Sequence, residues 1–335
     1  MARKLYDGAV TQQQARGGVS VSGVLSVVAG LAVFATFVWQ IGPGEIWSGI
    51  RNVGWMFPVI IALGGLRFLV RAWAWTLCVD HPHHLPLRPA LTAVLAGDAV
   101  GNVPPLGPLV GEPAKSALVR RHLPIQPALT ALAIENIFYT LSTAAMIAAG
   151  TIALLFAFDL NPALREFSEL AVAGIAVLIA AALLILWRQP AIISRWMPGA
   201  RSEGGDGASR GGKLRQVEDE IYSFARRRRG ALMPVILLEG SFHALGVLET
   251  HLAMWMILGQ PPLVMESFIL ETANRMITVA FKFIPFQLGV GEVGAAAVTQ
   301  IFGMGPLPGT TLAIVVKARK AVWALVGGAL LVRQR

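Results

Sequence analysis

The chain of 335 residues contains few charged residues and only one cysteine. Charged residues make up 14 % of the sequence, against roughly 25 % in a soluble domain. The single cysteine, Cys78, excludes an internal disulfide and a cysteine-based metal site. The sequence also has no P-loop, dinucleotide fingerprint, His-Glu-x-x-His or Gly-x-Ser-x-Gly motif. We therefore expect no enzyme activity and no cofactor or metal.

What is abundant is apolar sequence. Hydrophobic residues make up 55 %, and the mean hydropathy is +0.62. A bilayer core about 30 Å thick needs about 20 apolar helical residues. Six segments meet that length, at residues 21–41, 55–79, 128–158, 170–187, 231–258 and 310–332. The first is too long for a signal peptide and has no cleavage site. The predicted fold class is an all-α integral membrane protein with six transmembrane helices, forming a single transmembrane domain over residues 1–335.

Basic residues indicate the orientation of these spans. The segment 188–230 holds ten of them, and the other basic-rich segments fall on the same side if there are six spans. The positive-inside rule makes that side cytoplasmic, with both termini inside. The net charge of +9 therefore reports orientation rather than a nucleic-acid partner. Within 188–230, Leu214, Val217, Ile221 and Phe224 recur at helical spacing, which predicts an amphipathic helix on the inner leaflet. A plain stop-transfer charge cluster is the alternative.

An internal repeat appears when the sequence is shifted by 180 residues. Nine of thirty positions are then identical between 105–134 and 285–314, including Glu112 with Glu292. The repeats cover residues 55–158 and 231–332, and repeats of this kind are typical of transporters. The second and fifth spans are separated by an even number of spans, so they run in opposite directions. The repeat is therefore predicted to be inverted.

Each repeat contains a segment broken by proline and glycine. The stretch GNVPPLGPLVGEPAK, residues 101–115, holds four prolines and three glycines, and a second irregular region covers 266–305. Such a backbone must be buried in protein or line a wet cavity. We predict two re-entrant helical hairpins that meet near the midplane; an interfacial loop is the alternative. The residues expected to shape the hairpin backbone are Gly101, Pro104, Pro105, Gly111, Pro113, Pro285, Gly289 and Gly291.

Ionisable residues inside the spans are costly, so each is a candidate for function. Basic residues outnumber carboxylates near the broken segments, which favours an anionic ligand such as a phosphate-bearing headgroup. The alternative is that these charges pair internally and hold the repeats together. Glu249 and His251 are expected at the outer interface. The predicted lipid-binding residues are Arg67, Arg71, Glu112, Lys115, Glu135, Asn136, Glu271, Arg275, Lys282, Glu292, Lys317 and Lys320.

Active transport would need an ion gradient, because the sequence has no ATPase motif. Glu112, Glu135 and Glu292 are the candidate proton carriers, since a carboxyl group removed from water can titrate near neutral pH.

The motifs GNVPPLGPLVGEPAKSALV and FIPFQLGVGEVGAAAV, separated by spans, resemble the lysylphosphatidylglycerol synthase transmembrane-domain family over roughly residues 20–332. In the larger synthases of that family, this membrane part is associated with lipid flipping and a soluble domain makes the lipid. The resemblance therefore implies the transport part without the enzyme. The run AGDAVGN, residues 96–102, is similar to the hopanoid-associated subgroup, whose members are thought to take part in moving hopanoid lipids in bacteria.

Together these features predict a flippase-like lipid transporter of the bacterial inner membrane. It would move or bind an anionic or hopanoid lipid through a cavity between inverted repeats. Its partners would be membrane lipids and lipid-biosynthesis proteins, with no nucleic acid. The alternatives are a membrane enzyme acting on lipids and a non-transporting scaffold for lipid-synthesis enzymes.

Overall fold

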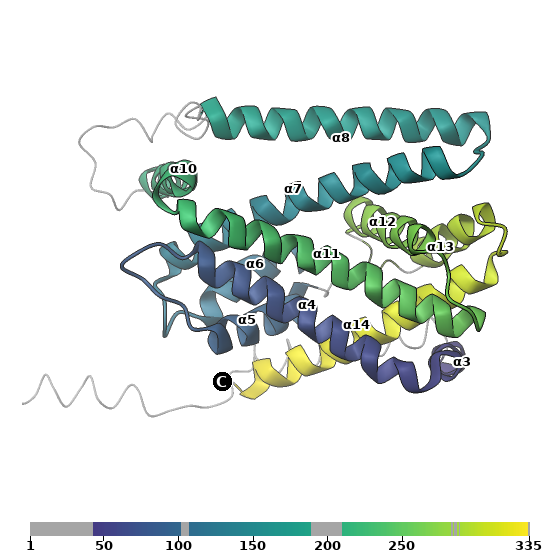
Figure 1. Ribbon diagram of the computed structural model, residues 1–335. Coiled ribbons are helices and arrows are strands. Elements are labelled where there is room, and N and C mark those ends of the chain that lie inside the picture. The colour runs from purple at the N-terminus through teal and green to yellow at the C-terminus, as the bar shows by residue number, and fades with distance from the viewer. Residues whose placement is uncertain are drawn as a thin grey trace, which may run out of the picture.

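The computed structural model describes residues 43–101, 107–188, 210–282, 284, 287 and 289–333, and these residues form helices without strands (Figure 1). The predicted all-α class is therefore confirmed for the described residues. The helices are α3 (Pro43–Val53), the 3₁₀ helix η1 (Gly54–Met56), α4 (Phe57–Cys78), α5 (Leu87–Gly101), α6 (Gly107–Leu118), α7 (Ile125–Ala157), α8 (Pro162–Arg188), α10 (Arg210–Arg227), α11 (Arg229–Leu258), α12 (Val264–Ala280), α13 (Val290–Ile301) and α14 (Leu307–Arg333).

Four helical segments are long and apolar enough to cross a membrane. They are Arg51–Cys78, Ile125–Ala157, Pro162–Arg188 and Arg229–Leu258. They match the second to fifth predicted spans, except that the second and third spans were each predicted one residue too long at the end. The first predicted span, residues 21–41, lies outside the described residues, so the six-span topology stays a prediction.

Two helices, α14 and α8, differ from the predicted spans in their charge or their start. The sixth predicted span lies in α14, which carries Lys317, Arg319 and Lys320 in its middle. α8 begins well before the predicted boundary at residue 170, because Asn161 caps it: its Oδ1 accepts a hydrogen bond from the Leu164 amide at 2.9 Å.

The first broken segment is more helical than its composition suggests. Only residues 102–106 separate α5 from α6. These five residues, which include Pro104 and Pro105, lie outside the described residues. α6 begins at Gly107, so Pro108 sits in the first turn, where its missing amide hydrogen costs nothing. Pro113 is tolerated inside α6 on an exposed face. Residues 107–118 are therefore helical despite their prolines and glycines, and the predicted re-entrant hairpin stays a prediction.

Glycines let the two helices of this pair approach closely. A Cβ on Gly111 would lie 3.2 Å from both the Gly101 Cα and the Gly97 carbonyl oxygen. In the second broken region α12 and α13 are also helices, and Gly289 precedes α13 with a φ of +77°, which favours glycine. Pro285 lies outside the described residues.

Helices at equivalent places in the two predicted repeats make equivalent contacts. α4 packs along α11, and each is the first helix of its repeat. α5 packs against α14, the last helix of the second repeat, while α12 packs against α7, the last helix of the first. The two sets of four helices are thus interlocked, and each broken segment is held partly by the other set (Figure 1).

Two helices lie at the edge of this assembly. α8 packs mainly against α7, and Ser168 is its one buried residue, so its apolar side chains are largely exposed, as expected in lipid. α10 packs against α7 and α11, and its Phe224 is buried in the protein core with Ile221 beside it. These two side chains of the predicted amphipathic face contact protein rather than lie on a leaflet.

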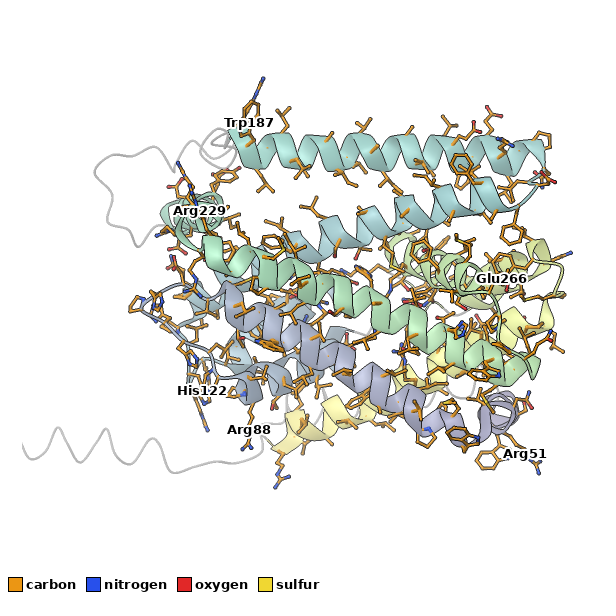
Figure 2. All side chains as sticks on the ribbon, viewed as in Figure 1. Arg51, Arg88, His122, Trp187, Arg229 and Glu266 are labelled. Atoms are coloured by element: carbon orange, nitrogen blue, oxygen red, sulfur yellow. The ribbon has the colours of Figure 1, made fainter. Side chains whose placement is uncertain are left out.

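Charged side chains gather at the two ends of the helices. Figure 2 places Arg88 and Arg229 at one end, and Arg51 and Glu266 at the other, with Trp187 near the first end. Trp187 is 79 % exposed. Charged side chains at both ends of apolar helices, with an exposed tryptophan at one of them, fit the pattern expected at the two surfaces of a bilayer.

Candidate functional site

A cavity of about 190 Å³ lies between the two sets of helices. Every helix of the first set contributes to its lining, and so do α11, α12 and α14 of the second. Six of the lining side chains are basic, namely Arg67, Arg71, Lys115, Arg275, Arg319 and Lys320. Asp98 is the one acidic residue in the lining. The remaining polar and aromatic side chains include Asn274, Gln287, Phe68, Tyr139, Phe242 and Trp323.

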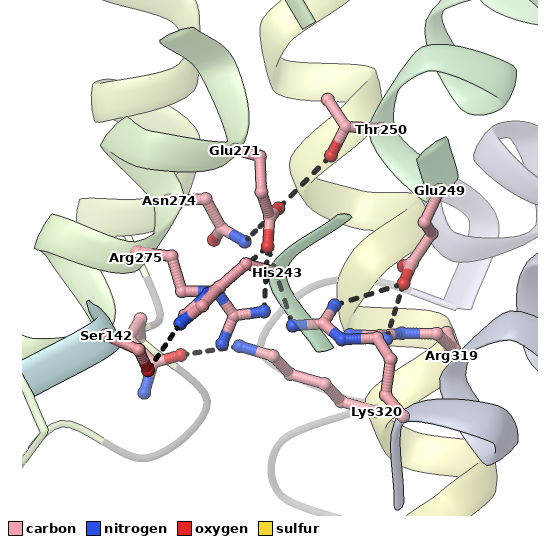
Figure 3. A network of polar contacts seen from close by, with 11 residues as sticks. Ser142, His243, Glu249, Thr250, Glu271, Asn274, Arg275, Arg319 and Lys320 are labelled. Carbon is pink, nitrogen blue, oxygen red and sulfur yellow. Dashed lines mark hydrogen bonds and ion pairs between the residues drawn. The ribbon is translucent and has the colours of Figure 1, made fainter. Parts of the chain in front are cut away.

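The first of two polar networks at the cavity is centred on Glu249 (Figure 3). Its Oε2 accepts hydrogen bonds from Arg319 Nη1 at 2.7 Å and from Arg67 Nη1 at 3.3 Å. Glu249 is 3 % exposed, so the expectation that it lies at the outer interface is wrong. One carboxylate of α11 therefore joins an arginine of α4 to an arginine of α14.

Glu271 extends this network onto α12. Its Oε1 accepts hydrogen bonds from Arg275 at 2.8 and 2.7 Å and lies 3.5 Å from Arg67 Nη2. Its Oε2 accepts from Thr250 Oγ1 at 3.2 Å and from Asn274 Nδ2 at 3.3 Å (Figure 3). Three arginines thus share two carboxylates, which leaves the network with an excess of one positive charge.

The second network joins α4 to α6 and α7. Arg71 donates from Nε to Glu135 Oε1 at 2.9 Å and from Nη2 to Glu135 Oε2 at 3.0 Å. Arg71 Nη2 also donates to Asn136 Oδ1 at 3.2 Å, and Asn136 Nδ2 donates to Glu112 Oε2 at 3.1 Å. Lys115 Nζ completes the chain by donating to Glu112 Oε1 at 2.7 Å.

Glu112 and Glu292, which the repeat aligns, have related surroundings. Both lie on the second helix of their broken segment, Glu112 in the middle of α6 and Glu292 in the first turn of α13. Glu112 bonds to Asn136 on α7, and Glu292 forms an ion pair with Lys317 on α14. Each glutamate therefore connects its broken segment to the last helix of its own repeat.

Aromatic rings support the arginines of the cavity. The Arg67 guanidinium carbon lies 4.4 Å from the centre of the Phe242 ring, and that of Arg275 lies 5.0 Å from it. Arg71 lies 4.1 Å from the centre of the Tyr139 ring. A cation held over an aromatic face keeps its charge and leaves part of its hydrogen-bonding edge free for a partner.

The structure separates the predicted site residues into three groups. Arg67, Arg71, Lys115, Arg275 and Lys320 line the cavity. Glu112, Glu135, Asn136 and Glu271 bond to those side chains. Lys317 is buried against Glu292 outside the lining, and Lys282 is exposed after the end of α12.

Other lining residues were not among the predicted ones. Arg319 directly precedes Lys320 in the sequence, but it has a different partner, Glu249 on α11. The charge of Arg319 within an apolar span could have indicated a site residue. The sequence offers no such indication for Tyr139, Phe242 and Trp323. In the described part of the chain, no three His, Cys, Asp or Glu side chains form a group that could hold a metal ion.

The family model described as "Lysylphosphatidylglycerol synthase TM region" matches residues 22–328. The chain belongs to this family. Both polar networks and the whole cavity lining lie inside the matched region, as do the four membrane-crossing helices. Neither the curated proteins nor the solved structures gave a significant match. The chain is thus a membrane protein of a family concerned with lipid handling.

Proposed function

We propose that the protein binds a lipid with an anionic headgroup in the central cavity and moves it across the membrane. The observation that carries this proposal is the lining, where six basic side chains face a single acidic one. Arginine and lysine are the residues that bind phosphate oxygens best, arginine as a planar fork and lysine as a point charge. Phe68, Tyr139, Phe242 and Trp323 supply apolar surface for the adjoining part of the lipid.

The internal pairs explain how so many cations can coexist without a ligand. Two carboxylates neutralise most of the Arg67, Arg275 and Arg319 group, and Glu112 and Glu135 neutralise Lys115 and Arg71. Lys320 differs from these, because Nζ donates to the neutral Oε1 of Gln287 at 2.7 Å. We infer that Lys320 is the cation that an incoming anion reaches with the least competition.

The movement would follow from the two interlocked sets. In this proposal α5 with α6 and α12 with α13 are re-entrant hairpins that enter from opposite faces, within six spans and an inverted repeat. The protein would lie in a bacterial inner membrane with both termini cytoplasmic. The lining favours an anionic phospholipid over a hopanoid, since a hydrocarbon triterpenoid offers nothing for six cations to bind. No covalent chemistry is part of the proposal.

Lipid movement by purified protein in liposomes tests it. Fluorescent phosphatidylglycerol and a labelled hopanoid would be compared, with Lys320→Gln as the test variant and Lys282→Gln as the matched control. Each loses one lysine charge, but Lys282 lies outside the cavity. A lost charge-assisted hydrogen bond of about 1.5–3 kcal/mol predicts roughly tenfold or greater weakening in Lys320→Gln alone.

Three other outcomes would count against the proposal. Equal rates of lipid movement for Lys320→Gln and Lys282→Gln would show that the lipid does not pass through the cavity. Movement of the hopanoid alone would replace the anionic substrate. No movement of any lipid by folded protein would favour a non-transporting partner of lipid-synthesis enzymes.

A further inference from the structure

Glu239 differs from the other carboxylates near the cavity. It lies on α11 with 2 % of its surface exposed, and within the described residues neither of its carboxylate oxygens has a hydrogen-bond partner. Glu112, Glu135 and Glu292, the predicted proton carriers, each pair with a cation instead. An ionised carboxylate is very costly to bury without such a partner, whereas the neutral acid is much less so.

Charged and titratable groups surround Glu239 from three helices. α4 provides Arg71 and Cys78, and α7 provides Glu135. His243 follows one turn later on α11 itself, with Nε2 3.1 Å from Ser142 Oγ (Figure 3). Arg71 donates two hydrogen bonds to Glu135, so this cation already has a carboxylate partner other than Glu239. The neighbouring Glu135 charge further disfavours a second carboxylate at this place.

Residues that interact electrostatically with Glu239 line two cavities. Its neighbour Arg71 lines the central cavity. Its other neighbour, Cys78, lines a second cavity of about 250 Å³, beside Asp80, Glu220 and Arg227. Glu220 and Arg227 belong to α10, so this second cavity lies at the α10 end of the bundle. Ile134, which precedes Glu135, also lines it.

We propose that Glu239 is a proton-binding site that sets the charge available to a ligand in the central cavity. With its proton, Glu239 is neutral and Arg71 balances Glu135 alone. Loss of the proton to water in the α10-end cavity places a second carboxylate beside Arg71. The cavity then has one positive charge less to offer, and an anion is held more weakly. This control of an anionic lipid rests on the proposed function, but the proton site itself does not.

Infrared spectroscopy of the protein in detergent tests the proton site directly. A protonated carboxyl group has a C=O stretching band apart from carboxylate bands. We expect such a band at neutral pH, its loss in Glu239→Gln, and its retention in the control Glu169→Gln, whose residue is exposed on α8. Glu239→Asp should keep a band at a shifted frequency. An identical band in Glu239→Gln and the wild type would overturn the proposal.

Binding of fluorescent phosphatidylglycerol, followed by anisotropy across a pH series, tests the control of the cavity. Wild-type binding should weaken as pH rises through the range in which the infrared band disappears. Glu239→Gln should bind with no change over that range, while Glu169→Gln follows the wild type. Matching pH profiles for Glu239→Gln and the wild type would overturn the control. No binding by any variant, with the infrared band present, would reject the proposed function and leave the proton site established.

Discussion

Arg71 on α4 and Glu135 on α7 form a two-pronged ion pair, with hydrogen bonds of 2.9 and 3.0 Å. The pair crosses 64 residues of sequence and fixes the first helix of the repeat to its last. Glu135 is 1 % exposed, so removing the arginine leaves a buried carboxylate without its ion-pair partner. The pair is thus a structural requirement of the first repeat as well as part of the cavity wall.

Arg71→Met should therefore be strongly destabilising. Removing one partner of a buried pair costs about 3–5 kcal/mol, because the other charge stays buried and unpaired. Thermal unfolding in detergent measures this loss. The double variant Arg71→Met with Glu135→Leu leaves no orphaned charge there and should recover much of the stability. A double variant as unstable as Arg71→Met would show that packing, rather than charge, accounts for the cost.

Gly246 makes room for the first polar network. A Cβ at this position would lie 2.5 Å from Glu271 Oε1 and 3.2 Å from Arg67 Cζ. Gly246→Ala should displace both side chains and cost about 1–3 kcal/mol, the usual range for overpacking. Gly240, on the same helix, has nothing within 4 Å of a Cβ. Gly240→Ala should be neutral or stabilising by up to about 1 kcal/mol. Equal unfolding temperatures for the two variants would mean that the network adapts freely.

The sequence predicted helices, the paired broken segments and most of the cavity charges, for a simple reason. A charge such as Arg67 or Lys320 stands out in an apolar run, and burying it needs a justification. The sequence could not predict the partners. Arg67 meets Glu249 across 182 residues, and only the packing of α4 on α11 brings them together. Glu249 was misplaced because it lies towards the predicted outer end of its span, whereas the structure pairs it with Arg319 on α14.

The extent of the irregular segments was overestimated for a local reason. Proline and glycine were counted by composition, but Pro108 falls where a helix begins and Pro113 on an outer face. In both places the residue costs less than it would in a buried helix centre. The aromatic residues under the arginines carried no signal at all, since phenylalanine and tyrosine are common in membrane spans.

α10 should detach when its buried aromatic anchor is removed. Phe224 is 3 % exposed, and its ring lies 6.4 Å from that of Phe138 on α7. Phe224→Ala removes about 3 kcal/mol or more of packing, so the opened form should be populated at least tenfold more. Trypsin cleavage at the four arginines 226–229 reports that opening, since cleavage follows the open population. Asp219→Ala on an exposed part of α10 is the control, and equal cleavage rates would show that α10 is held elsewhere.

The contact between the two repeats depends on Gly327. A Cβ there would overlap the carbonyl oxygen of Leu95 and lie 2.9 Å from the Ala99 Cβ, so α14 and α5 would have to separate. Because backbone atoms cannot move aside as a flexible side chain can, Gly327→Ala should cost about 1–3 kcal/mol of stability and shift the last helix of the second repeat relative to the first broken segment.

The adjacent Gly328 has nothing within 4 Å of a Cβ, so Gly328→Ala is a control that makes the same chemical change one residue away. Unfolding temperatures and lipid movement should both fall in Gly327→Ala and stay near wild type in Gly328→Ala. A loss of lipid movement at unchanged stability would mean that this contact serves the transport cycle rather than the fold, whereas wild-type behaviour in both variants would show that the repeats do not depend on close packing here.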